Sequence, residues 1–526
     1  MAFSRINASA ATLTKNRTEG SISTISGMCA TCVDGCIGMC EIGKSAYRGT
    51  EVIYPQPYGI ITSGADKDYP FDLSHFTILG TTVGAKGIEE SSDKAIFTNV
   101  NLERKLGRDG GIKIKLPITI GAMGSTAIAK NNWEGLAIGA AITGIPLAIG
   151  ENVCGMDPRA RITNGEVVHS PELERRIKLY KDWQQDGYGI IIVQTNIEDT
   201  KLGVDKYAIS QLGVEAIELK WGQGAKDIGG EVKIEDLNRA RMLKERGYIL
   251  IPDPDSPKIA KAFEQKRFTE FERHSRVGMV TEENFIARIE ELRNRGAKYI
   301  SLKTGAYRPA DLARALKFCS KTKVDLLTVD SAGGGTGMSP WRMMNEWGVP
   351  GVYLWSLLFQ FAEKLAAKGE YLPNITIAGG FTFEDQIFKG LALGAPYFKA
   401  ITMGRAPMAA AMVGKTIGKR MVEKQVPVYI ERFGTTPEEV FVTAPELREK
   451  FGDDFERIPT GALGLYTYMQ RLDQGLRQIA AGSRKFTLDH ISRDDIAALT
   501  EEAARISGIC YVTEVDKEEV CKILNT

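Results

Sequence analysis

From about residue 115 onward, short β-branched apolar runs alternate with longer patterns of helical periodicity. Eight runs have the length and composition of buried strands: Ile118–Ala122, Pro146–Gly150, Gly189–Gln194, Glu215–Lys220, Tyr299–Lys303, Val324–Val329, Asn374–Ala378 and Tyr397–Met403. Helical patterns lie between most of them, at Leu173–Gln185, Glu283–Arg295, Ala310–Phe318 and Leu357–Lys368. Eight buried strands, each followed by a helix or a functional loop, predict an α/β fold of the parallel (β/α)₈ type, the TIM barrel. An open doubly wound sheet is the alternative.

The same patterns divide the chain into four parts. We expect an N-terminal arm with a cysteine segment at residues 1–50, a lead-in at 51–114, the barrel at 115–430 and a helical extension at 431–526. The extension is predicted from helical patterns at Pro445–Phe451, Gly464–Ala481 and Asp494–Ile506. The stretch between Lys220 and Tyr299 is too long for one helix, so we expect a structured excursion over the barrel mouth.

Composition excludes some classes of partner. With 43% hydrophobic and 25% charged residues, the chain can bury a large core. A net charge of +1 favours neither nucleic acid nor an anionic membrane surface. No apolar run approaches the roughly 20 residues of a membrane span, and the first 28 residues lack a secretory apolar core. We expect a cytoplasmic protein, with the helical extension as a cap or a homo-oligomer contact.

Four of the eight cysteines lie close together in a C-x2-C-x3-C-x3-C pattern: Cys29, Cys32, Cys36 and Cys40. Thiolates this crowded repel one another and need a cation, and an iron–sulfur cluster, most simply [4Fe–4S], takes four of them. Structural zinc usually takes two separated pairs, and free thiols are the third reading. The other four are scattered and are expected to be buried small residues: Cys154, Cys319, Cys510 and Cys521.

Three glycine-rich turns follow expected strands. The first is Asp330–Pro340, with Ser331 and the glycines Gly333, Gly334 and Gly335. The others are Gly379–Gly380 and Gly404–Arg405, after the seventh and eighth strands. Glycine lets backbone N–H groups approach an anion closely, and barrels often bind phosphate at this position. A phosphate site gripped by Arg405 is therefore predicted; loops without a ligand and a surface salt bridge are the alternatives.

Other residues at strand ends suit a flat ring and a carboxylate. After the first strand, exposed backbone is offered by Gly121, Ala122, Met123, Gly124 and Ser125. Lys303 ends a buried strand and needs an anion there. That anion is either the N1–C2=O region of a reduced flavin or a carboxylate, Asp330 or Glu218. A second group, Lys220, Gln223 and Lys226, suits a carboxylate substrate.

Three stretches resemble the FMN- and 2-oxoglutarate-binding domain of glutamate synthase. They are Ile217–Lys226, which contains Gln-Gly-Ala-Lys, Asp330–Pro340, and Ile118–Ala127 continuing to Gly150-Glu151-Asn152. The resemblance covers about residues 115 to 420. It implies a TIM barrel, bound FMN and reductive amination of a 2-oxo acid by hydride from the flavin.

The resemblance also implies site residues. FMN would be held by Gly121–Ser125, Gln194, Lys303, Asp330, Ser331, Gly333–Gly335, Gly379–Gly380 and Gly404–Arg405. Lys220, Gln223 and Lys226 would face the substrate, with Glu151 as a further catalytic candidate. Electrons would come from ferredoxin or a partner subunit, and the N-terminal cysteine cluster would deliver them to the flavin.

Several segments depart from that family. Its Gly-Glu-Gly-Gly segment reads Gly150–Gly155 here, and its Pro-Pro-Pro-His stretch reads Pro252–Asp255. The family's cluster cysteines after the last strand are missing, since Gly404–Lys419 contains no cysteine. We expect no counterpart of that family's glutaminase domain, so ammonia would come from elsewhere. The alternatives are an oxidoreductase for another carboxylate or amine, such as an N-substituted amino acid, and a non-catalytic electron-transfer subunit.

Overall fold

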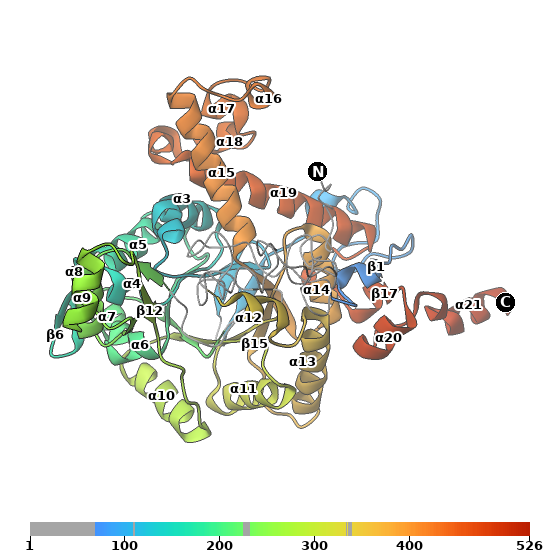
Figure 1. The fold of residues 1–526 in the computed structure, drawn as a ribbon. Coiled ribbons are helices and arrows are strands. Elements are labelled where there is room, and N and C mark those ends of the chain that lie inside the picture. The colour runs from blue at the N-terminus through green and yellow to red at the C-terminus, as the bar shows by residue number, and fades with distance from the viewer. Residues whose placement is uncertain are drawn as a thin grey trace, which may run out of the picture.

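Eight parallel strands close into a barrel at the centre of the computed structural model, which describes residues 69–108, 111–222, 224, 232–332, 334 and 339–525 (Figure 1). The strands are β4 (Ile118–Met123), β5 (Leu147–Ile149), β8 (Ile191–Thr195), β9 (Ala216–Lys220), β13 (Tyr299–Thr304), β14 (Leu326–Asp330), β15 (Asn374–Ala378) and β16 (Phe398–Met403). β16 pairs with β4 and β9 pairs with β13, so the sheet has no open edge. The TIM-barrel prediction is confirmed, and the open doubly wound sheet is excluded.

The strands lie within two residues of the expected runs because burial on both faces leaves a clear sequence signal. All five residues of β8 and of β14 are buried. The main connecting helices pack outside the barrel: α3 (Ala127–Thr143), α5 (Pro171–Lys181), α7 (Val204–Ser210), α10 (Glu282–Asn294), α11 (Pro309–Thr322), α13 (Gly351–Ala366), α14 (Glu384–Leu393) and α15 (Arg405–Val422).

A hairpin closes the amino-terminal end of the barrel. It consists of β2 (Arg104–Leu106) and β3 (Ile112–Ile114), paired antiparallel. Leu106 and Ile114 are buried together with Ala400 of β16. Arg108 forms an ion pair of 3.1 Å with Asp325, which directly precedes β14. The opposite, carboxyl-terminal end is therefore the end at which a site can form.

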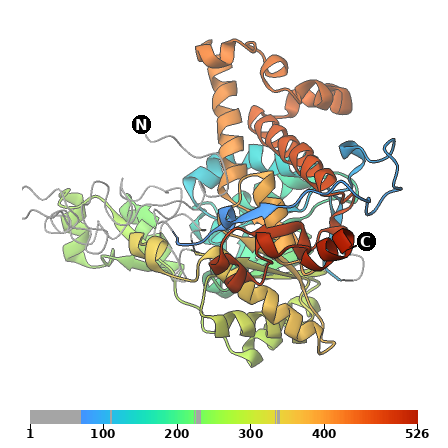
Figure 2. The same ribbon diagram turned by 90° about the vertical axis from the view of Figure 1, so that its right-hand side faces the viewer.

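The long segment between β9 and β13 is structured, as expected. It contains β10 (Val232–Ile234), α8 (Leu237–Glu245), β11 (Ile249–Ile251), α9 (Pro257–Glu264) and β12 (Phe271–His274). The strands form a sheet in the order β10-β12-β11. A small core of its own includes Leu243, Tyr248 and Phe271. Helices α8 and α9 lie together on one side of the barrel (Figure 1), and Figure 2 shows this segment projecting from the barrel.

The C-terminal part contributes both a projecting arm and barrel packing. The outer half of α15 leads to α16 (Val428–Glu431), α17 (Pro437–Val440) and α18 (Ala444–Phe451), which stand off the barrel (Figure 2). The chain returns through α19 (Thr460–Gly482), which packs on α15, α3 and α14. It ends with α20 (Glu501–Ser507) and α21 (Lys517–Asn525).

One expectation for this part is wrong. The run Asp494–Ile506 was expected to be one helix, but its residues Ile496–Ala498 form strand β17. β17 pairs antiparallel with β1 (Phe76–Ile78), more than 400 residues earlier in the chain. Such distant pairing overrides local helical pattern because backbone hydrogen bonds and burial on both sides stabilise the strand.

Glycines allow three helices to cross at very short range. A Cβ atom on Gly135 of α3 would lie 2.9 Å from the Cα atom of Gly461 in α19. A Cβ atom on Gly464 of α19 would lie 2.9 Å from the Cα atom of Gly414 in α15. Helix α19 therefore contacts both α3 and α15 backbone to backbone. Among the described helices, none is long and apolar enough to cross a membrane.

Candidate functional site

The predicted site residues that the structure describes gather at the carboxyl-terminal end of the barrel. Lys220 ends β9, Lys303 lies near the end of β13 and Asp330 ends β14. The remaining described candidates lie near or after the carboxyl ends of the barrel strands: Gly121–Ser125, Glu151, Gln194, Ser331, Gly334, Gly379–Gly380 and Gly404–Arg405. Outside the described residues lie Gln223, Lys226, Gly333, Gly335 and the four clustered cysteines, Cys29, Cys32, Cys36 and Cys40.

Lys303 is a buried cation surrounded by carboxylates. Its Nζ atom lies 3.3 Å from Oδ2 of Asp330, and the two side chains are 12% and 5% exposed. Burial alone would lower the pKa of Lys303, but Asp330 and Glu218 outweigh it, and the pKa is raised. A Cβ atom on Gly121 would lie 4.0 Å from the same Nζ atom, so the ammonium reaches towards β4. The ion pair with Asp330 is thus present, and the charge also faces the mouth.

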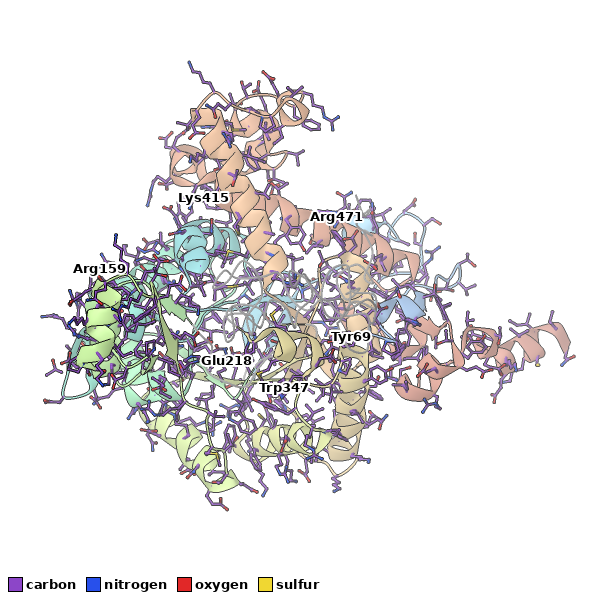
Figure 3. The ribbon with its side chains drawn as sticks, in the orientation of Figure 1. Tyr69, Arg159, Glu218, Trp347, Lys415 and Arg471 are labelled. Carbon is purple, nitrogen blue, oxygen red and sulfur yellow. The ribbon has the colours of Figure 1, made fainter. Side chains whose placement is uncertain are left out.

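Gln194 and Glu218 form a second buried polar group beside Lys303. Nε2 of Gln194 donates to Oε1 of Glu218 at 2.6 Å, and Oγ of Ser301 donates to Oε2 at 3.3 Å. Burial raises the pKa of Glu218, although Lys303 opposes that effect. The Oε1 atom of Gln194 is buried and has no hydrogen-bond partner among the described residues. Glu218 is labelled in Figure 3, where it lies among the barrel strands.

Two glycine turns pack so closely that neither Gly334 nor Gly379 has space for a side chain of its own. Gly379 follows β15 with φ 125°, and a Cβ atom there would overlap Oγ of Ser331. A Cβ atom on Gly334 would lie 2.6 Å from the Cα atom of Gly379. The backbone N–H of Ser331 donates to the carbonyl of Ala378 at 3.0 Å. The turns after β14 and β15 therefore pack closely against each other, with the side chain of Ser331 at Gly379 and that of Asp330 at Gly334. Glycine at both positions leaves backbone exposed in the way that an anion cradle uses.

Arg405 opens α15 directly after the third glycine turn. Its side chain is exposed, and partial desolvation lowers the pKa of the guanidinium. Within the described part of the chain, it forms neither an ion pair nor a hydrogen bond. The alternative of a surface salt bridge is therefore not observed among these residues, and the guanidinium is available to a ligand at the N-terminus of a long helix.

A buried arginine that sequence reasoning missed fixes the loop after β4. Nη1 of Arg176, on α5, donates to the carbonyls of Met123 at 3.0 Å and Gly124 at 2.9 Å. Its Nε atom donates to Glu172 at 2.9 Å, and its guanidinium lies over the ring of Trp133. In the sequence, Glu172 and Arg176 look like an ordinary exposed helical pair at spacing four. Only the 1% exposure of Arg176 reveals its structural role.

Lys220 and Glu151 form a hydrogen-bonded ion pair at the mouth, with side chains 11% and 20% exposed. The residue after Glu151 is fixed by a carboxylate, because both oxygens of Asp199 accept from the backbone N–H of Asn152, at 3.1 and 3.0 Å. Burial raises the pKa of Asp199 to about 7. The backbone next to Glu151 is therefore held by Asp199, a carboxyl group whose pKa of about 7 lets it change charge near neutral pH.

A second missed arginine belongs to the excursion itself. Arg273, on β12, is 2% exposed, and its guanidinium lies 5.0 Å from the ring centroid of Tyr248. It donates to Oγ of Ser275 at 2.8 Å, while its Nε atom has no partner among the described residues. Burial lowers the pKa of Arg273, and Tyr248 and Glu151 oppose that effect. The excursion thus brings a buried positive charge near Glu151.

The scattered cysteines divide into two pairs. Cys154 and Cys319 are buried, as expected, and burial raises the pKa of both thiols. Cys510 and Cys521 are exposed, so the expectation is wrong for them. Cys521 lies on α21, a helix with no buried residue. No group of three or more potential metal ligands occurs in the described part of the chain.

Comparison with known proteins identifies related sequences. A family model described as the conserved region in glutamate synthase matches residues 89–257 and 272–415. A "glutamate synthase large subunit-like protein" of Rhizobium meliloti (strain 1021) is 24% identical over 501 residues, which cover 90% of this chain and 92% of that protein. The "glutamate synthase large subunit-like protein YerD" of Bacillus subtilis (strain 168) is 23% identical over 300 residues, 56% of this chain and 49% of that protein.

Solved structures with a similar fold include a flavocytochrome b2 variant with pyruvate bound. Its TM-score is 0.46 at 13% sequence identity, and the match covers 81% of this chain and 77% of that chain.

Proposed function

Because the chain belongs to the family of the conserved region in glutamate synthase, we propose that it is an FMN-dependent oxidoreductase that reduces a 2-oxo acid or its imine to an amino acid. The main support for this proposal is that the residues matched by the family model include the candidate site. The matched residues 89–257 and 272–415 contain all eight barrel strands and every described candidate residue from Gly121 to Arg405.

The described residues fit an FMN molecule at both of its ends. The glycine turns at Gly334 and Gly379 and the guanidinium of Arg405 suit a phosphate. Lys303 and the unpartnered Oε1 atom of Gln194 suit the pyrimidine edge of a flavin, which carries negative charge on reduction and has an N–H donor. When bound, FMN supplies the hydride; the chain supplies position and charge.

The ion pair of Lys220 and Glu151 is the proposed substrate contact. An ammonium that is 11% exposed at the barrel mouth can exchange its carboxylate partner for the carboxylate of a substrate. Glu151 would then be released to hold or transfer a proton at the substrate nitrogen. Gln223 and Lys226 are proposed to complete this contact.

We propose that electrons reach the flavin through an iron–sulfur cluster of the [4Fe–4S] type, held by Cys29, Cys32, Cys36 and Cys40. Their spacing supports this assignment, since four closely spaced thiolates suit such a cluster. Ferredoxin or a partner subunit would donate the electrons.

A different carboxylate or amine, such as an N-substituted amino acid, is the second candidate substrate. The segment Pro252–Asp255 favours it, because the resemblance places its counterpart near the substrate. Here Asp253 and Asp255 are more than half exposed and pair with Lys244 of α8, at 2.5 and 2.8 Å. This pairing on the surface of the excursion supports a substrate contact that differs from the one implied by the resemblance.

The test begins with protein purified without oxygen. Released FMN and flavin absorption bands would support the proposal; a sample that stays colourless after reconstitution with FMN and iron–sulfur reagents would end it. Candidate 2-oxo acids and amino acids are then titrated while the flavin spectrum is recorded. Lys220→Gln should weaken the spectral response to carboxylates at least tenfold and leave the FMN content unchanged. An unchanged response would remove Lys220 from the substrate site.

A further inference from the structure

We propose that Glu218 is a positioning residue whose buried charge weakens the stabilisation that Lys303 gives to the reduced flavin. The inference rests on the proposed function, because it requires bound FMN. Glu218, which lies two residues before the end of β9, would thereby influence the reduction potential of the flavin.

The barrel register places the two side chains on one face. Ser301 of β13 is directly opposite Glu218 of β9, and Lys303 lies two residues further along β13. Side chains two residues apart on a strand point to the same side. Glu218 and Lys303 therefore both face the barrel interior, on neighbouring strands. Glu218 is 5% exposed, and the side chain of Lys303 is 12% exposed.

Both hydrogen bonds of Glu218 come from donors, which favours the ionised carboxylate, and neither comes from Lys303. Its two oxygens accept from Gln194 at 2.6 Å and from Ser301 at 3.3 Å. The direct partner of Lys303 is Asp330, at 3.3 Å. The other charged groups that act on Glu218 or Lys303 are Lys220 and Glu151, which pair with each other. Glu218 therefore acts on Lys303 through space, and its own orientation does not depend on Lys303.

The consequence concerns the charge that reduction creates. An oxidised flavin that takes two electrons from a reductant and one proton from solvent gains one negative charge, located mainly at N1–C2=O. Lys303 stabilises that charge, whereas Glu218 opposes it. In a buried site, removal of one opposing unit charge changes such an equilibrium by about a factor of ten or more. Glutamine at position 218 keeps the size and a hydrogen-bond acceptor but removes the charge.

The experiment measures the two-electron equilibrium between the flavin of the purified holoprotein and a reference dye, during slow reduction by dithionite. Glu218→Gln should shift the equilibrium at least tenfold towards reduced flavin, which corresponds to about 30 mV for a two-electron couple. Ser301→Ala is the matched control, because it removes a hydrogen bond from the same carboxylate and leaves the charge. It should shift the equilibrium less than about twofold.

Glu218→Asp provides a second test if the glutamine variant does not retain FMN. It keeps the charge but withdraws it by one methylene group, so the shift should have the same direction and be smaller. A holoprotein in which neither variant changes the equilibrium more than Ser301→Ala, or in which the shift favours oxidised flavin, would overturn the inference. Absence of FMN from the unmodified protein would instead contradict the proposed function.

Discussion

Replacement of Arg176 by methionine should destabilise the barrel and weaken FMN binding together. The side chain is 1% exposed and pairs with Glu172, which is itself 6% exposed. Removal of one partner from a buried pair costs about 3–5 kcal/mol, because the other charge stays buried. The variant also loses two hydrogen bonds from a charged donor to the carbonyls of Met123 and Gly124. These losses overlap, so we expect about 3–5 kcal/mol in the free energy of unfolding.

Arg175 provides a matched control within the same helix. It pairs with the same carboxylate of Glu172, at 2.9 Å, but is 39% exposed. Burial alone would raise the pKa of Glu172; hydrogen bonds from both arginines outweigh it, and the pKa is lowered. Exposed pairs contribute at most about 1 kcal/mol, so Arg175→Met should cost about 1 kcal/mol or less. It should leave the affinity for FMN unchanged.

The assay is urea unfolding followed by tryptophan fluorescence, with FMN affinity measured from the quenching of flavin fluorescence. For Arg176→Met we expect the dissociation constant of FMN to rise more than tenfold, because the loop Gly121–Ser125 loses its two carbonyl anchors. Equal losses of stability in the two variants would refute the reasoning. So would an Arg176→Met protein that loses less than about 1 kcal/mol and binds FMN normally.

Three further predictions concern the turns, the pH dependence and the cysteine cluster. Gly379→Ala should abolish FMN binding, measured by flavin fluorescence, because a Cβ atom would overlap Ser331. The control is Gly369→Ala, where φ is 68° and no atom lies within 4 Å of the added Cβ atom; it should lower the free energy of unfolding by about 1 kcal/mol and leave FMN binding intact. Burial raises the pKa of Asp199 from 3.8 to about 7, so the folded state keeps a proton that the unfolded state has lost. Stability from this group therefore falls as pH rises from about 4 to 7, by about 4 kcal/mol in total and by about 3 kcal/mol between about pH 5 and pH 8. Asp199→Asn should remove this difference in urea unfolding measured at about pH 5 and pH 8. Replacement of the four clustered cysteines by serine should remove the iron–sulfur absorption and stop flavin reduction by the physiological donor; normal flavin reduction without a cluster would contradict the proposed electron route.

The barrel could be predicted from the sequence because its strands are buried on both faces. Such strands read as continuous apolar runs, and Ile191–Thr195 and Leu326–Asp330 are examples. The carboxyl-terminal placement of Lys220 and Lys303 followed from the parallel topology alone. The local sequence pattern is therefore sufficient to predict the strands and the end of the barrel at which Lys220 and Lys303 lie.

The missed features depend on contacts between distant segments. Strand β17 forms because Phe76–Ile78 offers it an edge, which no local pattern of Asp494–Ile506 contains. Arg176 and Arg273 occupy positions that are ordinarily exposed, and their burial depends on which loops fold over them. The partner of Lys220 was missed for the same reason, since Glu151 reaches it from two strands away in the barrel order.

The glycine crossings of α19 make the far end of the chain part of the site's geometry. Helix α3 begins immediately after the Gly121–Ser125 loop, and α15 begins at Arg405. Both helices pack against α19 at Gly461 and Gly464, where the backbones are in contact and no intervening side chain can adjust its conformation. A displacement of α19 would therefore move both the Gly121–Ser125 loop, which is proposed to contact the flavin ring, and Arg405, which is proposed to bind the phosphate. For protein engineering, this means that a minimal catalytic fragment cannot stop after the eighth strand and its helix, and that insertions are better tolerated in the outer arm than in α19.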